Sequence, residues 1–363
     1  MSSERYRYAI VGTGRPWKWE GATGFGMAHP HWEGFRATER VDLVAVADIR
    51  AEAGRQFLTD ENVEAAAVYT DFRAMLAEQK PEVVSICTWP HLHAELTIAT
   101  AEAGVRAIHC EKPMATTWGD AKRMKAAADA NRTILTFNHQ RRFLGVFQRA
   151  KEELAAGAIG ELKRMEAQCG DMFDWGTHWL DMLFFFNNET PAEWVIGQID
   201  SRTENRVFGA AQENQAICHF KCTNGVRGLL VTGYEADLGT AIRLIGSDGV
   251  LEIGWEKPWL RLRTKGDSDW RTIDTLEGIH GNIAIDRACA DLIRALDEPS
   301  YKPLLSVDNA IHHTEVIYAT YESSRQRGRI DLPLQAEDSA LIAMLEAGDI
   351  GPNRKTGETN CEY

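Results

Sequence analysis

Asp174 and His178 are the pair of side chains in this sequence best suited to moving a proton. They are four residues apart at the start of a helical pattern, so they would lie on one face of a helix. A carboxylate there can orient an imidazole, whose charge changes near neutral pH. The spacing predicts that His178 is a general base and that Asp174 sets its tautomer or binds a neighbouring hydroxyl group. Asp181, one turn further on, would contact substrate or be a carboxylate on the helix surface or at an interface.

Lys112 follows an apolar run that ends at Cys110. An ammonium group at the C-terminal edge of a parallel sheet can stabilise a developing alkoxide and, with a depressed pKa, relay its proton. Pro113 would then give the chain a stiff exit that holds the lysine in place. The alternative is a solvent-facing lysine at a strand end.

Gly12, Thr13 and Gly14 follow the first β-like run, where two glycines let the backbone turn tightly and approach a pyrophosphate at a helix N-terminus. The third small residue of the usual fingerprint is missing, because Trp17 stands in its place. Residues 15–26 look like an insertion before the helix resumes at about residues 26–28. The alternative is a glycine turn without a ligand.

Asp48 ends the second β-like run, where a carboxylate can accept both hydroxyl groups of an adenosine ribose. Such a carboxylate would repel a ribose phosphate, which favours NAD over NADP as the cofactor. Arg50 lies close enough to soften that preference, so NADP stays as the alternative. Asp48 could instead cap a helix or lie at a solvated strand end.

Trp17 and its neighbours in the insertion follow the first strand, whose end would border the cofactor cleft. Tryptophan there could stack on a sugar ring, or it could pack against the other domain or a second subunit. The pairs His29-x-His31 and His91-x-His93 have no Cys or carboxylate partners at ligand spacing, so we predict no metal.

Two kinds of sheet should position these residues. In the first part, six β-branched or apolar runs alternate with helix patterns such as 71–79, 91–104 and 116–130, the pattern of a parallel sheet covered by helices. The runs lie at 8–12, 43–48, 66–70, 83–88, 105–110 and 133–137. We predict an α/β Rossmann domain, with a doubly wound parallel sheet, over residues 1–137.

After residue 137, helix patterns near 144–156 and 175–186 precede many alternating strands with turn signals. Asn224-Gly225 and Asp248-Gly249 are strong hairpin dipeptides, so this sheet should be open and largely antiparallel. Helix patterns follow at 281–297 and 305–325. We predict an α+β domain for substrate binding and oligomerisation over residues 138–335, with a C-terminal helix and polar tail over 336–363.

Composition limits the class of protein. A chain of 363 residues favours two domains, and a net charge of −13 argues against nucleic acid as a partner. The seven cysteines are odd in number and scattered, as expected for reduced thiols in the cytoplasm. No apolar stretch is long enough to span a membrane, and the N-terminal residues do not read as a signal peptide.

Residues 88–115 (TWPHLHAELTIATAEAGVRAIHCEKPMA) resemble the Gfo/Idh/MocA oxidoreductase family. The segments VYTDF (68–72), HQRRF (139–143), DWGTHWLD (174–181) and NGVRGLL (224–230) look like further landmarks of that family. The resemblance implies a Rossmann domain plus an α/β domain whose open sheet often forms the oligomer contact, here a homodimer or homotetramer. It also implies that Lys112 reaches both the substrate hydroxyl group and the nicotinamide ribose.

Other site residues follow from the same resemblance. The match to a DxGxHxxD motif falls on Asp174, His178 and Asp181, which the resemblance makes substrate-binding residues together with Lys112. Contacts to the cofactor are implied for residues at the ends of the later strands, Thr88, His93 and Glu111. Gln140 and Arg141, at the domain crossing, would contact the cofactor or the substrate. Arg142 could be a structural ion-pair partner instead, and His93 could cap the helix that follows it.

The function expected from these residues is NAD(P)-dependent transfer of hydride between nicotinamide and a secondary hydroxyl group of a sugar, inositol or sugar derivative. Two alternatives use the same scaffold. One is a redox-assisted glycosidase with tightly held NAD, and the other is a catalytically inactive dinucleotide-sensing regulatory protein. Lys112, Asp174 and His178 speak against the sensor, and nothing in the sequence separates the two enzymes.

Overall fold

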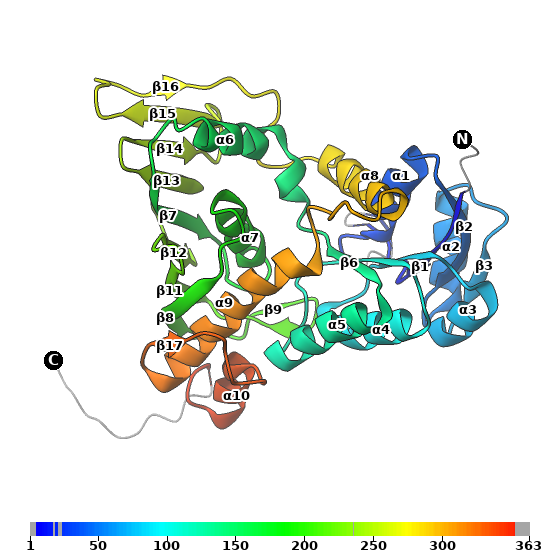
Figure 1. The fold of residues 1–363 in the computed structure, drawn as a ribbon. Helices are drawn as coiled ribbons and strands as arrows, with labels where there is room; N and C mark the ends of the chain where they lie inside the picture. The colour runs from blue at the N-terminus through cyan, green and yellow to red at the C-terminus, as the bar shows by residue number, and fades with distance from the viewer. Residues whose placement is uncertain (1–4, 17–18, 21–23, 235, 353–363) are drawn as a thin grey trace.

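The structure is a computed structural model that describes residues 5–16, 19–20, 24–234 and 236–352. Its strands form a six-stranded sheet in the first part of the chain, a nine-stranded sheet in the second, and a small two-stranded ribbon. Figure 1 shows the two large sheets side by side, each with helices packed on it. The predicted fold class is confirmed.

The first sheet is parallel throughout, in the order β3-β2-β1-β4-β5-β6. Its strands are nearly all buried, as expected for a sheet covered on both faces. The order reverses between β1 and β4, which is where doubly wound folds bind their ligands. The strands are β1 (Tyr6–Val11), β2 (Val41–Ala47), β3 (Ala67–Tyr69), β4 (Val83–Ile86), β5 (Ala107–Cys110) and β6 (Ile134–Phe137).

Helices cover both faces of this sheet. On one face lie α1 (Ala28–Ala37), α2 (Ala51–Asp60) and, from late in the chain, α8 (Ile283–Asp297). On the other lie α3 (Phe72–Gln79), α4 (Pro90–Glu102) and α5 (Trp118–Asn131). The predicted domain boundaries stay a prediction, and α8, which falls within the predicted second domain, packs against α1 of the first.

The second sheet is largely antiparallel, in the order β16-β15-β14-β13-β7-β12-β11-β8-β17. Its one parallel pair among the described residues is β7 with β12. Both hairpin dipeptides lie at the predicted turns: Asn224-Gly225 lies between β11 and β12, and Asp248-Gly249 lies at the turn from β13 into β14, which begins at Gly249. The strands are β7 (Leu162–Cys169), β8 (Ala192–Asp200), β11 (Gln215–Cys222), β12 (Arg227–Thr232), β13 (Ile242–Gly246), β14 (Gly249–Ile253), β15 (Leu260–Thr264), β16 (Arg271–Thr272) and β17 (Ile330–Asp331).

One face of the second sheet carries α6 (Gly145–Ala155), α7 (Gly176–Phe186) and α9 (Val307–Gln326), as Figure 1 shows. In β11, Cys218, Phe220 and Cys222 are fully buried beneath them, whereas Ile217 is 47% exposed on the opposite face. No helix of the described residues covers that opposite face. The remaining elements are η1 (Gln140–Phe143), β9 (Arg206–Val207), β10 (Ala210–Ala211) and α10 (Ala340–Ala347).

Among the described residues, no helix combines the length and the apolar character needed to cross a membrane.

Candidate active site

A cleft of about 870 Å³ lies at the C-terminal ends of the first sheet's strands, and we call it the central cleft. Residues that end or follow β1, β2, β4, β5 and β6 line one side of it, and residues of the second part of the chain line the other. Of the residues singled out from the sequence, those lining it are Gly12, Gly14, Asp48, Arg50, Thr88, Glu111, Lys112, Gln140, Arg141, Asp174 and His178.

Gly12 has a backbone conformation and surroundings that exclude a side chain. Its φ is +88°, and a Cβ atom at this position would lie 2.8 Å from Cγ2 of Thr88 and 2.9 Å from the carbonyl oxygen of Cys87. Glycine therefore lets the turn after β1 approach the segment after β4. The absence of a side chain also leaves the backbone open toward the central cleft.

Asp48 is tied to the same turn. One carboxylate oxygen accepts hydrogen bonds from the backbone N–H (3.0 Å) and hydroxyl group (3.2 Å) of Thr13. The other accepts the backbone N–H of Arg50 at 3.0 Å. The Nε atom of Arg50 lies 3.9 Å from that same oxygen, and 56% of the Arg50 side chain is exposed. Asp48 thus lies at the mouth of the glycine turn, where a ribose would need it.

The predicted role of Trp17 lies outside the described residues. Trp19, from the same insertion, is 45% exposed, and its ring centroid lies 5.2 Å from that of His29. Phe25 at the end of the insertion lines the central cleft and meets Phe208 edge-on at 5.5 Å. Part of the insertion therefore packs against a loop of the second part of the chain.

Lys112 and Asp174 meet in the central cleft, although they are 62 residues apart. The ammonium group donates a hydrogen bond of 2.5 Å to Oδ1 of Asp174, and the two side chains are 15% and 8% exposed. The sequence predicted that Asp174 would either set the tautomer of His178 or bind a neighbouring hydroxyl group, and the structure does not place it as a partner of His178 among the described residues. Asp174 instead precedes α7, which begins at Gly176, so the spacing rule for a helix face does not apply to it.

His178 lines the same cleft from the first turn of α7. Burial lowers its pKa well below the ordinary value, and the positive charges of Arg141 and Lys112 lower it further. The ring is therefore neutral at neutral pH and able to accept a proton. Its Nδ1 atom is buried and has no hydrogen-bond partner among the residues that the structure describes.

Glu111 is held ionised beside Lys112. Burial alone would raise its pKa, but hydrogen bonds from His31 (2.9 Å) and Asn138 (2.7 Å) outweigh burial and bring the pKa to about 2. His31 also contacts the Ser85 hydroxyl group at 3.1 Å. This histidine of the discounted His29-x-His31 pair therefore anchors the segment that carries Lys112.

His93 lies beneath the central cleft and does not line it. Its ring is fully buried, with Nδ1 2.8 Å from the carbonyl oxygen of Pro113 and Nε2 3.0 Å from that of Thr88. Burial lowers the pKa of His93. The histidine predicted to contact the cofactor therefore joins the segment after β4 to the segment after β5.

Gln140 and Arg141 reach the central cleft from η1, at the crossing between the two parts of the chain. Trp175 and His280 line the cleft next to them, and the sequence analysis missed both. Trp175 stands inside the DWGTHWLD landmark and could have been found there. His280 precedes α8 in a loop that carries no recognisable pattern.

Asp181 does not reach the central cleft. Its two oxygens each accept a hydrogen bond of 2.8 Å from Arg142, which is also paired with Glu189. Arg142 is fully buried, so the ion-pair role considered for it is the one the structure shows.

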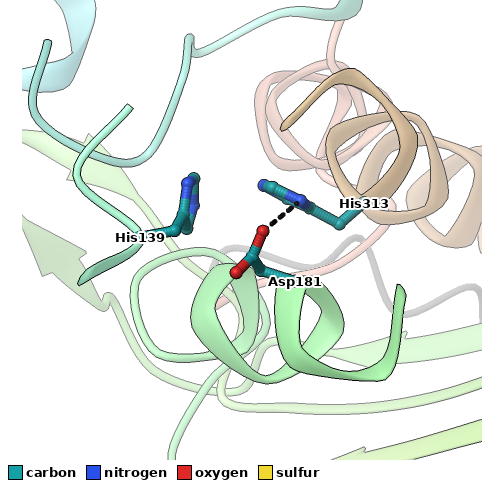
Figure 2. A group of neighbouring side chains, drawn as sticks. All are labelled: His139, Asp181 and His313. Carbon is teal, nitrogen blue, oxygen red and sulfur yellow. Dashed lines mark ion pairs between the residues drawn. The ribbon is translucent and has the colours of Figure 1, made fainter. Parts of the chain in front are cut away.

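Asp181 also lies beside His139 and His313, as Figure 2 shows. These side chains come from three segments, and one ligand atom of each lies within 4.8 Å of the others, an arrangement of metal-binding residue types that the sequence did not reveal. His313 is 3.4 Å from Asp181, and His139 contacts the hydroxyl group of Thr177 at 2.9 Å. The guanidinium of Arg142 already supplies positive charge to this carboxylate, which disfavours a second cation there.

The comparisons with known proteins agree with this geometry. Residues 6–139 match the model of the oxidoreductase family with an NAD-binding Rossmann fold, GFO_IDH_MocA. The resemblance to the Gfo/Idh/MocA family is confirmed. The central cleft is accordingly that of an NAD-binding Rossmann domain.

Two curated relatives are similar over parts of the chain. One is D-glucoside 3-dehydrogenase of Escherichia coli, 31% identical over 45% of this chain and 42% of the relative. Another is myo-inositol 2-dehydrogenase of Thermotoga maritima, 25% identical over 67% of this chain and 73% of the relative. The match thus spans less than half of the first relative and about three quarters of the second.

A solved structure extends the likeness in fold to nearly the whole chain. A levoglucosan dehydrogenase in complex with NADH has a TM-score of 0.77 and 19% identity, and the match covers 91% of this chain and 100% of that one. The likeness in fold therefore includes the second sheet as well as the first.

Proposed function

We propose that this protein oxidises a secondary hydroxyl group of a sugar, an inositol or a sugar derivative, with NAD as the hydride acceptor. The observation that carries the proposal is that Lys112, Asp174 and His178 line the same cleft as Gly12 and Asp48. Proton-transfer groups and a dinucleotide turn thus share one cavity.

Each side chain has a definite task in this proposal. Lys112, positioned by Asp174, donates a hydrogen bond to the reacting oxygen and stabilises negative charge on it. His178 accepts the hydroxyl proton as the carbon–oxygen double bond forms. NAD supplies the nicotinamide ring that takes the hydride from the same carbon.

Two features of the cleft itself, apart from the comparisons, support a dinucleotide as its ligand. Gly12 leaves the backbone bare where a pyrophosphate would approach, and Asp48 stands at the ribose position beside it. Because a carboxylate repels a ribose phosphate, we propose NAD rather than NADP. The sugar class is supported by the names of the relatives, D-glucoside 3-dehydrogenase and myo-inositol 2-dehydrogenase.

The test is the appearance of NADH absorbance when the protein is mixed with NAD and a panel of sugars, inositols, sugar acids and glycosides. We expect stoichiometric NADH with at least one of them. Lys112→Met and His178→Asn should each lower kcat by roughly 10²- to 10⁴-fold. Lys122→Met, an exposed lysine of α5, is the matched control and should leave kcat unchanged.

Other outcomes would contradict the proposal. Glycoside cleavage without net NADH would indicate the redox-assisted glycosidase. Thermal stabilisation by NAD without any turnover would indicate the sensor.

We also propose a cytoplasmic homo-oligomer. The open face of the second sheet exposes apolar side chains, as expected of a subunit contact. Six cysteines among the described residues are free thiols, as in a reducing compartment.

A further inference from the structure

Arg141 is a buried cation without a carboxylate partner among the described residues. It is 8% exposed and lines the central cleft. The adjacent Arg142 is fully buried and has two partners, Asp181 and Glu189. Buried charges are normally paired because their removal from water costs free energy. Arg141 departs from the rule that its neighbour follows.

The guanidinium of Arg141 is fixed in position. Its Nη1 atom donates to the carbonyl oxygen of Ile279 and to Nδ1 of His280, the latter at 3.3 Å. Its carbon lies 4.6 Å from the ring centroid of Trp179 and 5.8 Å from that of Trp175. These contacts hold the group but use only part of its five donors, and Nε has no hydrogen-bond partner within the described part of the chain.

Asp174 and Glu111, two carboxylates that line the same cleft as Arg141, already have partners. Asp174 accepts the ammonium group of Lys112, and Glu111 accepts His31 and Asn138. Burial lowers the pKa of Arg141 to about 10, and the charge of Asp174 offsets this only in part. The substrate side of the cleft thus presents a rigid, uncompensated cation.

We propose that Arg141 binds a carboxylate of the substrate, and that the protein therefore oxidises a sugar acid in preference to the corresponding neutral sugar. This rests on the proposed function and narrows its substrate class. The planar fork of a guanidinium matches the two oxygens of a carboxylate. Trp175, 39% exposed in the same cleft, offers an aromatic face to the C–H groups of the sugar ring.

A dinucleotide pyrophosphate is the other anion that such a guanidinium could bind, and the experiment separates the two. It compares kcat/KM for glucose with glucuronate and for galactose with galacturonate, together with the Kd for NADH from a fluorescence titration. The proteins are wild type, Arg141→Met, Arg141→Lys and, as matched control, Arg149→Met, an exposed arginine of α6.

We expect wild type to prefer the acid in at least one pair by tenfold or more. Arg141→Met should lower kcat/KM for the acid by roughly 10- to 150-fold, mainly through KM, because a charge-assisted hydrogen bond is lost. The neutral sugar should lose less, the Kd for NADH should change less than threefold, and Arg141→Lys should restore part of the preference. Arg149→Met should behave as wild type.

The proposal is overturned if wild type uses neutral sugars as well as their acids, or if Arg141→Met lowers kcat/KM equally for both members of a pair. A matching loss of NADH affinity would assign Arg141 to the cofactor. Should no sugar be oxidised, the proposed function fails, and thermal stabilisation of the NADH-loaded protein by each hexuronate still tests the subsite. Absence of stabilisation in wild type, or equal stabilisation in Arg141→Met, refutes the subsite.

Discussion

His178 enters the proposed reaction as a neutral ring, because burial and the charges of Arg141 and Lys112 lower its pKa. A general base works in its unprotonated form, so activity is lost only when the pH falls through that lowered pKa. We expect kcat/KM for sugar oxidation to show no histidine titration between about pH 6.5 and pH 8. A pH profile of the wild-type protein checks this, and an acid limb with an apparent pKa at or above about 6.5 would contradict it.

Asp48 should decide between the two nicotinamide cofactors. Asp48→Ser removes the carboxylate proposed to accept the ribose hydroxyl groups, so kcat/KM for NAD should fall by roughly 10- to 150-fold while that for NADP rises. Steady-state kinetics with both cofactors give the ratio. Asp42→Ser, an exposed aspartate of β2, is the control. A ratio unchanged by Asp48→Ser would show that this carboxylate serves only the Thr13 turn.

Residues that lie in a local motif could be predicted as site residues from the sequence. The side chains that they contact in the fold could not. Lys112 and His178 lie in the cleft as their motifs predicted. The partner of Asp174 was expected four residues away and lies 62 residues away instead, because residue spacing describes only neighbours on one element. Trp175 and His280 reach the site through tertiary packing, and His280 has no local pattern at all.

At the scale of elements, Arg142 fastens η1 to α7 and to the turn after it, because it bonds both Asp181 and Glu189. Arg142→Met leaves the buried carboxylate of Asp181 and the partly buried carboxylate of Glu189 without their cation, and it should cost about 3–5 kcal/mol in the free energy of unfolding. Adding Asp181→Leu should recover part of that loss. Urea unfolding measures both, with Arg149→Met expected to stay within about 0.5 kcal/mol of wild type. A single variant as stable as wild type would exclude this role.

Helices and strands were predicted well where a hydrophobic pattern within the segment itself indicates them. Each strand of the first sheet overlaps its predicted run, because a buried parallel strand shows as a continuous apolar stretch. The helix pattern at 281–297 was also correct in type. An amphipathic pattern says that a helix buries one face without saying against what, so the packing of α8 on α1 could not be predicted.

At the scale of the whole molecule, the open face of the second sheet leads to a prediction about the oligomeric state. Ile196 and Ile217 are each 47% exposed there, on neighbouring strands. We expect a homodimer or homotetramer through this face, and Ile196→Lys with Ile217→Lys should dissociate it because buried charge is costly. Light scattering after size exclusion gives the molar mass, and Leu276→Lys, a fully exposed loop residue, is the control. A monomeric wild type, or a double variant of unchanged mass, would rule out this interface.

His93 stands between two carbonyl oxygens, and a neutral imidazole carries a single N–H. The proton can serve the segment that bears Thr88 or the segment that follows Lys112, but not both at once. The carbonyl oxygens of Thr88 and Pro113 therefore compete for the single N–H of the buried ring, and each tautomer serves one of them.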